Sequence, residues 1–145
     1  MLDLDFSLDQ MTVAATGTES NRLEDIARYV LEQQGARGAW TVAVALVSDE
    51  HLQRLHFDFM GVDEATDVMT FPLSESGGEQ GGDIAISVDH ALAHGTEWGN
   101  SPAEEIEFLM VHGLLHLMGW RDEDDAQRTA MLLRQEEILQ GYREG

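Results

Sequence analysis

Apolar residues along the 145-residue chain recur either at every second position or at the three- and four-residue spacing of a helix. The period of two over residues 2–7, where Leu and Phe alternate with Asp and Ser, predicts a half-buried strand. The run WTVAVALV at residues 40–47 is apolar on both faces and predicts a central strand. Two further strands are predicted at residues 67–73, which end near a proline, and at residues 83–88.

Helical spacing predicts two helices in the first half of the chain. Asn21 followed by Glu24 resembles a capping box, and apolar residues then recur at helical spacing up to Gly35. Ser48 is expected to cap a second, short helix that continues through about Phe59.

Three more helices are predicted in the second half. A short one is expected at residues 89–94, ended by Gly95. Pro102 fits the first turn of a long apolar helix that Gly119 ends, since glycine readily adopts the left-handed conformation found there. An amphipathic helix is expected at residues 123–140.

The remaining segments, at residues 61–66 and 74–82, are rich in Gly, Ser and acidic side chains and predict loops. Strands and helices are mixed without strict alternation. The pattern therefore predicts one compact α+β domain over residues 1–145, with a small mixed sheet of about four strands packed against helices.

Composition narrows the classes of partner. The formal net charge of −20 repels DNA, RNA and anionic membranes at long range, so we expect no DNA partner and no membrane. No apolar run approaches the roughly 18 residues of a membrane span, and the first residues lack the basic start of a signal peptide. A cytoplasmic protein is expected. Because there is no cysteine, any metal site must use His, Asp or Glu.

The stretch HGLLHLMGWRD carries the candidate chemistry. His112 and His116 are one helical turn apart, so both imidazoles fall on one face of the long helix. Gly119 lets the chain turn back, and Asp122 then reaches toward the same point. We interpret His112, His116 and Asp122 as three ligands of one zinc ion per chain, with the fourth position left for a catalytic water.

The same three residues are also compatible with purely structural roles. A histidine on so apolar a helix can be a hydrogen-bonded core residue, and Asp122, with Asp125 three residues later, can be a helix N-cap. Asp122 can also do both. Gly113 replaces the glutamate of the HExxH metalloprotease motif, which argues against peptide hydrolysis and leaves room for close packing or for substrate.

The other histidines and the nearby tryptophans are expected to lie on the surface or in the core rather than to bind a metal. A solvated face accounts for His90 and His94, and His51 and His56 have no convincing partner in the sequence. Trp98 and the tryptophan at position 120 flank the histidine helix and are expected in the core or at its rim.

Three blocks of the sequence resemble the YbeY endoribonucleases, which are rRNA maturation factors. TDVMTFPL at residues 66–73 is similar to a TDVLSFP strand of that family, and GDIAIS at residues 82–87 is similar to its GDI strand. HGLLHLMGWRD at residues 112–122 resembles the family signature HGxLHLxGYDH. The last block is the specific one, and the resemblance covers nearly the whole chain.

This resemblance implies a zinc-dependent endoribonuclease that cleaves single-stranded RNA in 16S rRNA maturation and ribosome quality control. His112 and His116 match the first two zinc ligands of the family, and Asp122 stands where the third is usually histidine. Trp120 and Arg121 replace Tyr and Asp in the signature. The implied partners are rRNA or other single-stranded RNA, and the small ribosomal subunit or its assembly factors.

Two departures from the family pattern bear on catalysis. The carboxylate of Asp122 would leave the metal less positive than a third imidazole does, so we predict a less acidic bound water and more tolerance of harder metals. Met60 stands where many members carry an arginine thought to contact the substrate phosphate. The sequence does not show whether Arg121 or Arg54 compensates.

Two alternative functions follow from these departures. The chain can be a ribosome-assembly binding protein with a structural or vestigial zinc, which Met60 and the acidic charge favour. It can also be a metal hydrolase of small or peptide substrates, which the glycine at position 113 disfavours.

Overall fold

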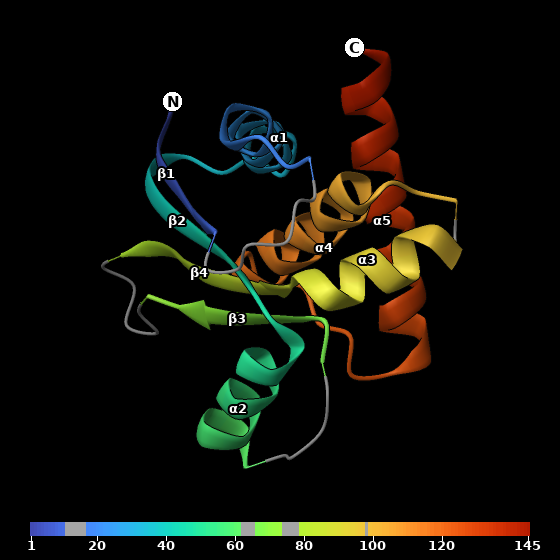
Figure 1. The fold of residues 1–145 in the computed structure, drawn as a ribbon. Coiled ribbons are helices and arrows are strands. Elements are labelled where there is room, and N and C mark those ends of the chain that lie inside the picture. Colours follow the sequence, from blue (N-terminus) through green and yellow to red (C-terminus); the bar gives the residue numbers. More distant parts are fainter. Residues whose placement is uncertain (11–16, 62–65, 74–78, 98) are drawn as a thin grey trace.

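A four-stranded mixed sheet with helices on both faces forms the structure, a computed structural model that describes residues 1–10, 17–61, 66–73, 79–97 and 99–145 (Figure 1). Its elements are, in order, β1 (Leu2–Gln10), α1 (Ser20–Gln33), β2 (Gly38–Val47), α2 (Asp49–Met60), β3 (Val68–Pro72), β4 (Gln80–Ser87), α3 (Val88–Glu97), α4 (Pro102–Leu117) and α5 (Asp125–Glu144).

The strand order is β1-β2-β4-β3. Strands β1, β2 and β4 are parallel, and β3 pairs antiparallel with β4 at the edge. The strand that is apolar on both faces, β2, lies inside the sheet, with one face buried in the core and the other only partly covered. The predicted α+β domain with about four strands is therefore confirmed.

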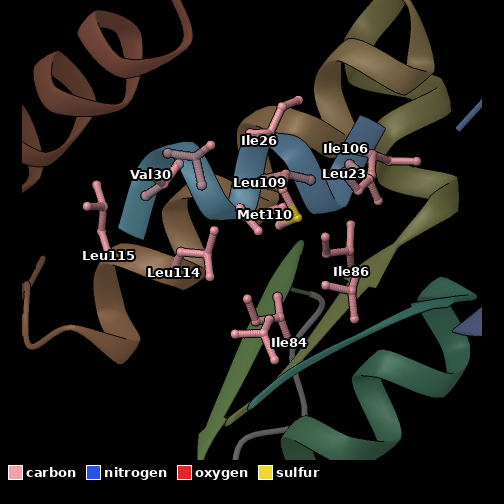
Figure 2. Close-up of a cluster of buried hydrophobic side chains, with 14 of the residues drawn as sticks. Leu23, Ile26, Val30, Ile84, Ile86, Ile106, Leu109, Met110, Leu114 and Leu115 are labelled. Carbon is pink, nitrogen blue, oxygen red and sulfur yellow. The ribbon is translucent and has the colours of Figure 1, made fainter. Parts of the chain in front are cut away.

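The main core lies between one face of the sheet and helices α1 and α4 (Figure 2). Branched and long apolar side chains from three elements meet there, among them Ile26 of α1, Met110 of α4 and Ile84 of β4, each fully buried. On the other face Leu52 of α2 forms a smaller cluster with Val47 and Ala85 of the sheet. Helix α4 is thus packed against the sheet, α1, α3 and α5 (Figure 1).

A buried carboxylate ties the three helices together away from the sheet. Glu107 of α4 is 4% exposed and accepts hydrogen bonds from Arg22 of α1, at 2.6 Å, and Arg143 of α5, at 3.2 Å. The bond from Arg22 to Glu107 raises the pKa of the Arg22 guanidinium above its ordinary value. The two arginines offset the cost of removing the Glu107 carboxylate from water. Their shared partner therefore links α1 and α5 to α4.

A glycine lets α4 lie close against the sheet. A Cβ atom on Gly113 would stand 2.9 Å from Cγ2 of Ile84 and 3.2 Å from Cγ2 of Thr70, both on the sheet. The space beside the first histidine of the motif is therefore filled by the sheet, so Gly113 serves close packing and leaves no room there for substrate. A glutamate at this position, as in the HExxH motif, would not fit.

Several boundaries differ from the predictions, and β1 and α5 each extend a few residues past their predicted ends. The capping box at Asn21 and Glu24 is wrong: α1 begins at Ser20, after Glu19, and no side chain caps it. Helix α3 continues through Gly95, whose missing side chain instead admits the carbonyl of Asn100, 3.0 Å from where a Cβ would be. Strand β4 begins at Gln80, inside the predicted loop, because it extends along β2.

Two other features agree with the sequence. Ser48 caps α2 by accepting a hydrogen bond from the backbone N–H of His51. Among the helices described, none is both long and apolar enough to cross a bilayer.

We expect Gly113→Ala to destabilise the fold even though alanine favours helices. Overpacking costs about 1–3 kcal/mol, whereas the gain in helix propensity is about 1 kcal/mol. Urea unfolding in the presence of a chelator measures the change without any contribution from bound metal. In an Ile84→Ala background the same substitution should lose most of its cost, because the blocking methyl groups are gone. An equal cost in both backgrounds would contradict the close-packing account.

Candidate metal centre

The last turn of α4 and the loop after it bring two imidazoles and a carboxylate to one point. The Nε2 atoms of His112 and His116 are 3.0 Å apart. An Oδ2 oxygen of Asp122 lies 3.4 Å from the first and 3.3 Å from the second. We call these three side chains the His-His-Asp group. Among the residues described, no other cluster of three such side chains has the geometry to hold a metal ion.

The turn that ends α4 delivers Asp122. Gly119 has a φ of 99°, and its N–H and that of Trp120 donate to the carbonyls of His116 and Leu115. This pair of bonds is a Schellman motif, which needs a residue with positive φ at the glycine position. The predicted role of Gly119 is confirmed, and the chain leaves the helix folded back along it.

Both imidazoles have an oxygen acceptor on the side away from the group. Nδ1 of His116 lies 2.9 Å from the carbonyl oxygen of Trp120, which the same turn supplies. Nδ1 of His112 lies 3.0 Å from Oε1 of Gln135 on α5. An oxygen acceptor requires a proton on Nδ1, so in each neutral ring the lone pair is on Nε2 and faces the group.

Three electron pairs therefore converge on one small space. Without a positive charge between them, the two Nε2 lone pairs and the carboxylate of Asp122 would repel one another. The three residues are partly withdrawn from water, with side chains 21%, 24% and 38% exposed in chain order. A metal ion held between the three donor atoms would relieve this repulsion.

The size of the triangle fits a zinc ion. Bond lengths of about 2.0–2.1 Å in a tetrahedral site place donor atoms about 3.3–3.4 Å apart. Two edges of the group have this length, and the edge between the histidines is shorter, at 3.0 Å. Imidazole nitrogen and carboxylate oxygen are ordinary zinc donors, so the residues present fit this ion.

Helix α5 supports the loop as well as the ring of His112. Arg128 donates to the backbone carbonyl of Asp122 at 3.2 Å, and its side chain also pairs with Asp125. The N-cap of α5 is Asp124, which accepts from the N–H of Gln127 at 2.7 Å. The alternative that Asp122 is merely this N-cap is therefore wrong, and its carboxylate is available to the group.

A cavity of about 280 Å³ opens over the group. Its wall opposite the two histidines comes from α2 and β3, and its lining includes His56, Met60, Asp67 and Thr70. A larger hollow, of about 590 Å³, lies between α2 and the sheet, and it contains none of the three residues. The smaller cavity is the one where a substrate would meet the group.

The structure brings His56 to this cavity, which the sequence did not indicate. The signal was present, because His56 and Met60 are four residues apart on α2 and so share a face. Met60 lines the cavity and is 65% exposed.

Neither arginine that could compensate for Met60 lines the cavity. Arg54 pairs with Glu50 at 3.4 Å, and Arg121 pairs with Glu123 at 3.7 Å.

The remaining candidates lie outside the group. The rings of His90 and His94 stack with centroids 3.9 Å apart, and Nε2 of His90 lies 3.6 Å from Asp67, so this pair is more than a solvated face. Trp120 packs against the main core, as expected, while Trp98 lies outside the described residues.

We expect Asp122→Ala to weaken zinc binding by more than the roughly 10–100-fold that losing an outer-shell partner costs. Glu123→Ala removes an exposed carboxylate from the next position and is the matched control. Elemental analysis and competition with a chelator measure both. Unchanged zinc occupancy in Asp122→Ala would remove this residue from the ligand set.

Comparisons with known proteins agree with the motif. A sequence model described as endoribonuclease YbeY matches residues 6–143. A protein named endoribonuclease YbeY from Halalkalibacterium halodurans is 36% identical over 132 residues, covering 83% of this chain and 81% of that protein. One of the same name from a Geobacillus species is 32% identical over 153 aligned positions, covering 98% of this chain and 97% of that protein.

The fold also has a solved counterpart. The solution structure of TM1509 from Thermotoga maritima superposes with a TM-score of 0.58 at 24% identity, covering 99% of this chain and 93% of that one. This likeness concerns the fold alone.

Proposed function

Because the chain belongs to the endoribonuclease YbeY family, we propose that it is a zinc-dependent endoribonuclease that cleaves single-stranded RNA. The reaction is hydrolysis of a phosphodiester at the His-His-Asp group. Its cellular role is maturation of 16S rRNA and ribosome quality control in the cytoplasm, with the small ribosomal subunit or its assembly factors as partners.

The observation that carries this proposal is a three-donor group that faces a cavity. Structural zinc sites usually have four protein ligands, whereas catalytic sites have three and leave a position open. Here two rings with fixed tautomers and one carboxylate converge from α4 and its loop, and the cavity lies over them. When bound, zinc would supply an activated water and a positive charge for the phosphodiester oxygen.

The residues of this chain divide the remaining work. His112, His116 and Asp122 would hold the ion, and the Schellman turn keeps the carboxylate in place. His56 and Met60 form the opposite wall, against which the RNA would lie.

The acidic surface constrains how RNA arrives. With a net charge of −20 and no arginine in the lining of the cavity, the chain offers little long-range attraction to a polyanion. We therefore propose that partner proteins on the ribosomal small subunit deliver the RNA. At the His-His-Asp group a bound metal ion would supply local positive charge.

We expect purified protein loaded with zinc to cut a labelled single-stranded RNA. Cleavage should be lost in His116→Ala and in chelator, because either change removes the ion, and circular dichroism should show that the variant keeps its fold. Glu123→Ala should cut like the wild-type protein. Equal cleavage by His116→Ala would point to a contaminating nuclease and contradict the proposal.

The alternative function is a ribosome-assembly binding protein whose zinc is structural. Met60, at the position where the family resemblance expects arginine, favours it. A pull-down of ribosomal subunits separates the two functions. A wild-type protein that binds subunits but cuts no RNA, with binding retained in His116→Ala, would support the binding role.

We expect Met60→Arg to strengthen binding of single-stranded RNA. One added phosphate contact should make the slope of the logarithm of the binding constant against the logarithm of the salt concentration more negative by about 0.7. Met60→Leu is the neutral control at the same exposed position. Binding measured by fluorescence anisotropy at several salt concentrations tests this. If the slope is the same in both variants, no substrate phosphate lies near residue 60.

A further inference from the structure

One polar side chain lies on the otherwise apolar buried stripe of α5. Gln135 is 0% exposed, and its buried neighbours on this face are Met131, Ile138 and Leu139. Burying an amide is unfavourable unless hydrogen bonds replace those to water. Both ends of the Gln135 amide are hydrogen-bonded, and both partners belong to α4.

The amide has only one favourable orientation. Its Nε2 donates to the backbone carbonyl of Phe108 at 3.3 Å, which leaves Oε1 toward Nδ1 of His112 at 3.0 Å. A flipped amide would place oxygen against the carbonyl of Phe108, where two acceptors repel. The carbonyl therefore decides which end of Gln135 the imidazole meets.

A fixed oxygen acceptor has a direct effect on His112. It holds the ring proton on Nδ1 and so keeps the Nε2 lone pair directed at His116 and Asp122. It also holds the ring plane, because rotation would break the bond. Partners of this kind orient metal-binding histidines and raise their basicity.

We propose that Gln135 is a positioning residue that sets the tautomer and orientation of His112 and thereby the metal affinity of the His-His-Asp group. The inference rests on the proposed metal site. His116 differs, because its Nδ1 acceptor is the backbone carbonyl of Trp120, which no substitution of a side chain removes. Gln135 is thus the side chain through which α5 acts on an imidazole of the group, whereas Arg128 acts on the backbone of Asp122.

The test compares three variants with the wild-type protein in Co²⁺ and Zn²⁺ titrations. Gln135→Leu removes the acceptor, and Gln135→Glu keeps an oxygen opposite Nδ1 of His112. Ile138→Ala is the matched control, since it removes buried side-chain volume from the same helix without touching the imidazole. Competition with a chromophoric chelator gives the affinities, and visible absorption of bound Co²⁺ reports the coordination geometry.

We expect Gln135→Leu to bind roughly 10–100-fold more weakly and with altered Co²⁺ absorption. Gln135→Glu should lose less affinity than Gln135→Leu, because it keeps an oxygen opposite Nδ1 of His112 but sets a second oxygen against the carbonyl of Phe108. Ile138→Ala should keep the wild-type affinity despite a lower Tm. Long-range ¹H–¹⁵N NMR should show the Nδ1–H tautomer of His112 in the wild-type protein and a mixture of tautomers in Gln135→Leu.

Each contrary result has a distinct meaning. Wild-type affinity in folded Gln135→Leu, an equal loss in Ile138→Ala, or a loss in Gln135→Glu as large as in Gln135→Leu would overturn the assignment while leaving the metal site intact. A wild-type protein that binds neither ion would overturn the proposed metal site and, with it, the role of Gln135.

Discussion

The candidate site depends on where two ring protons lie. Oxygen acceptors at Gln135 and at the carbonyl of Trp120 hold a proton on Nδ1 of each imidazole. The lone pairs of the two Nε2 atoms, which are 3.0 Å apart, therefore face each other and Asp122. Since Asp122 adds a carboxylate to the same space, the folded chain creates a local need for positive charge. The net charge of −20 of the whole chain adds a general attraction for cations.

Helix α4 meets two demands at once. Most of its surface is apolar and packed against the sheet, α1, α3 and α5, and its C-terminal end carries the histidines toward the cavity. Gly113 allows α4 to pack closely against β4. Gly119 provides the turn that brings Asp122 back to the histidines. The same two glycines therefore serve both packing and the site, and small errors in either would misplace the three donor atoms.

Much of this was predictable from local sequence. Hydrophobic periodicity located every strand and helix to within a few residues, and the spacing of His112 and His116 indicated a shared face. What failed depended on contacts that hydrophobic periodicity does not show. The end of α3 was misjudged at Gly95 because its glycine serves packing against Asn100, and His56 could not be placed in the cavity without knowing how α2 lies. Gln135 is an intermediate case, since a glutamine on an apolar stripe is visible in the sequence but its partner is not.

The most direct test of the account is a crystal structure of untagged protein grown with zinc and without chelator, with anomalous data recorded at the zinc edge. We expect one anomalous peak per chain, about 2.0–2.2 Å from Nε2 of His112, Nε2 of His116 and a carboxylate oxygen of Asp122. Both Nδ1 atoms should keep their oxygen partners. A map with no peak there, and with the three side chains turned apart or bonded only to protein, would contradict the account.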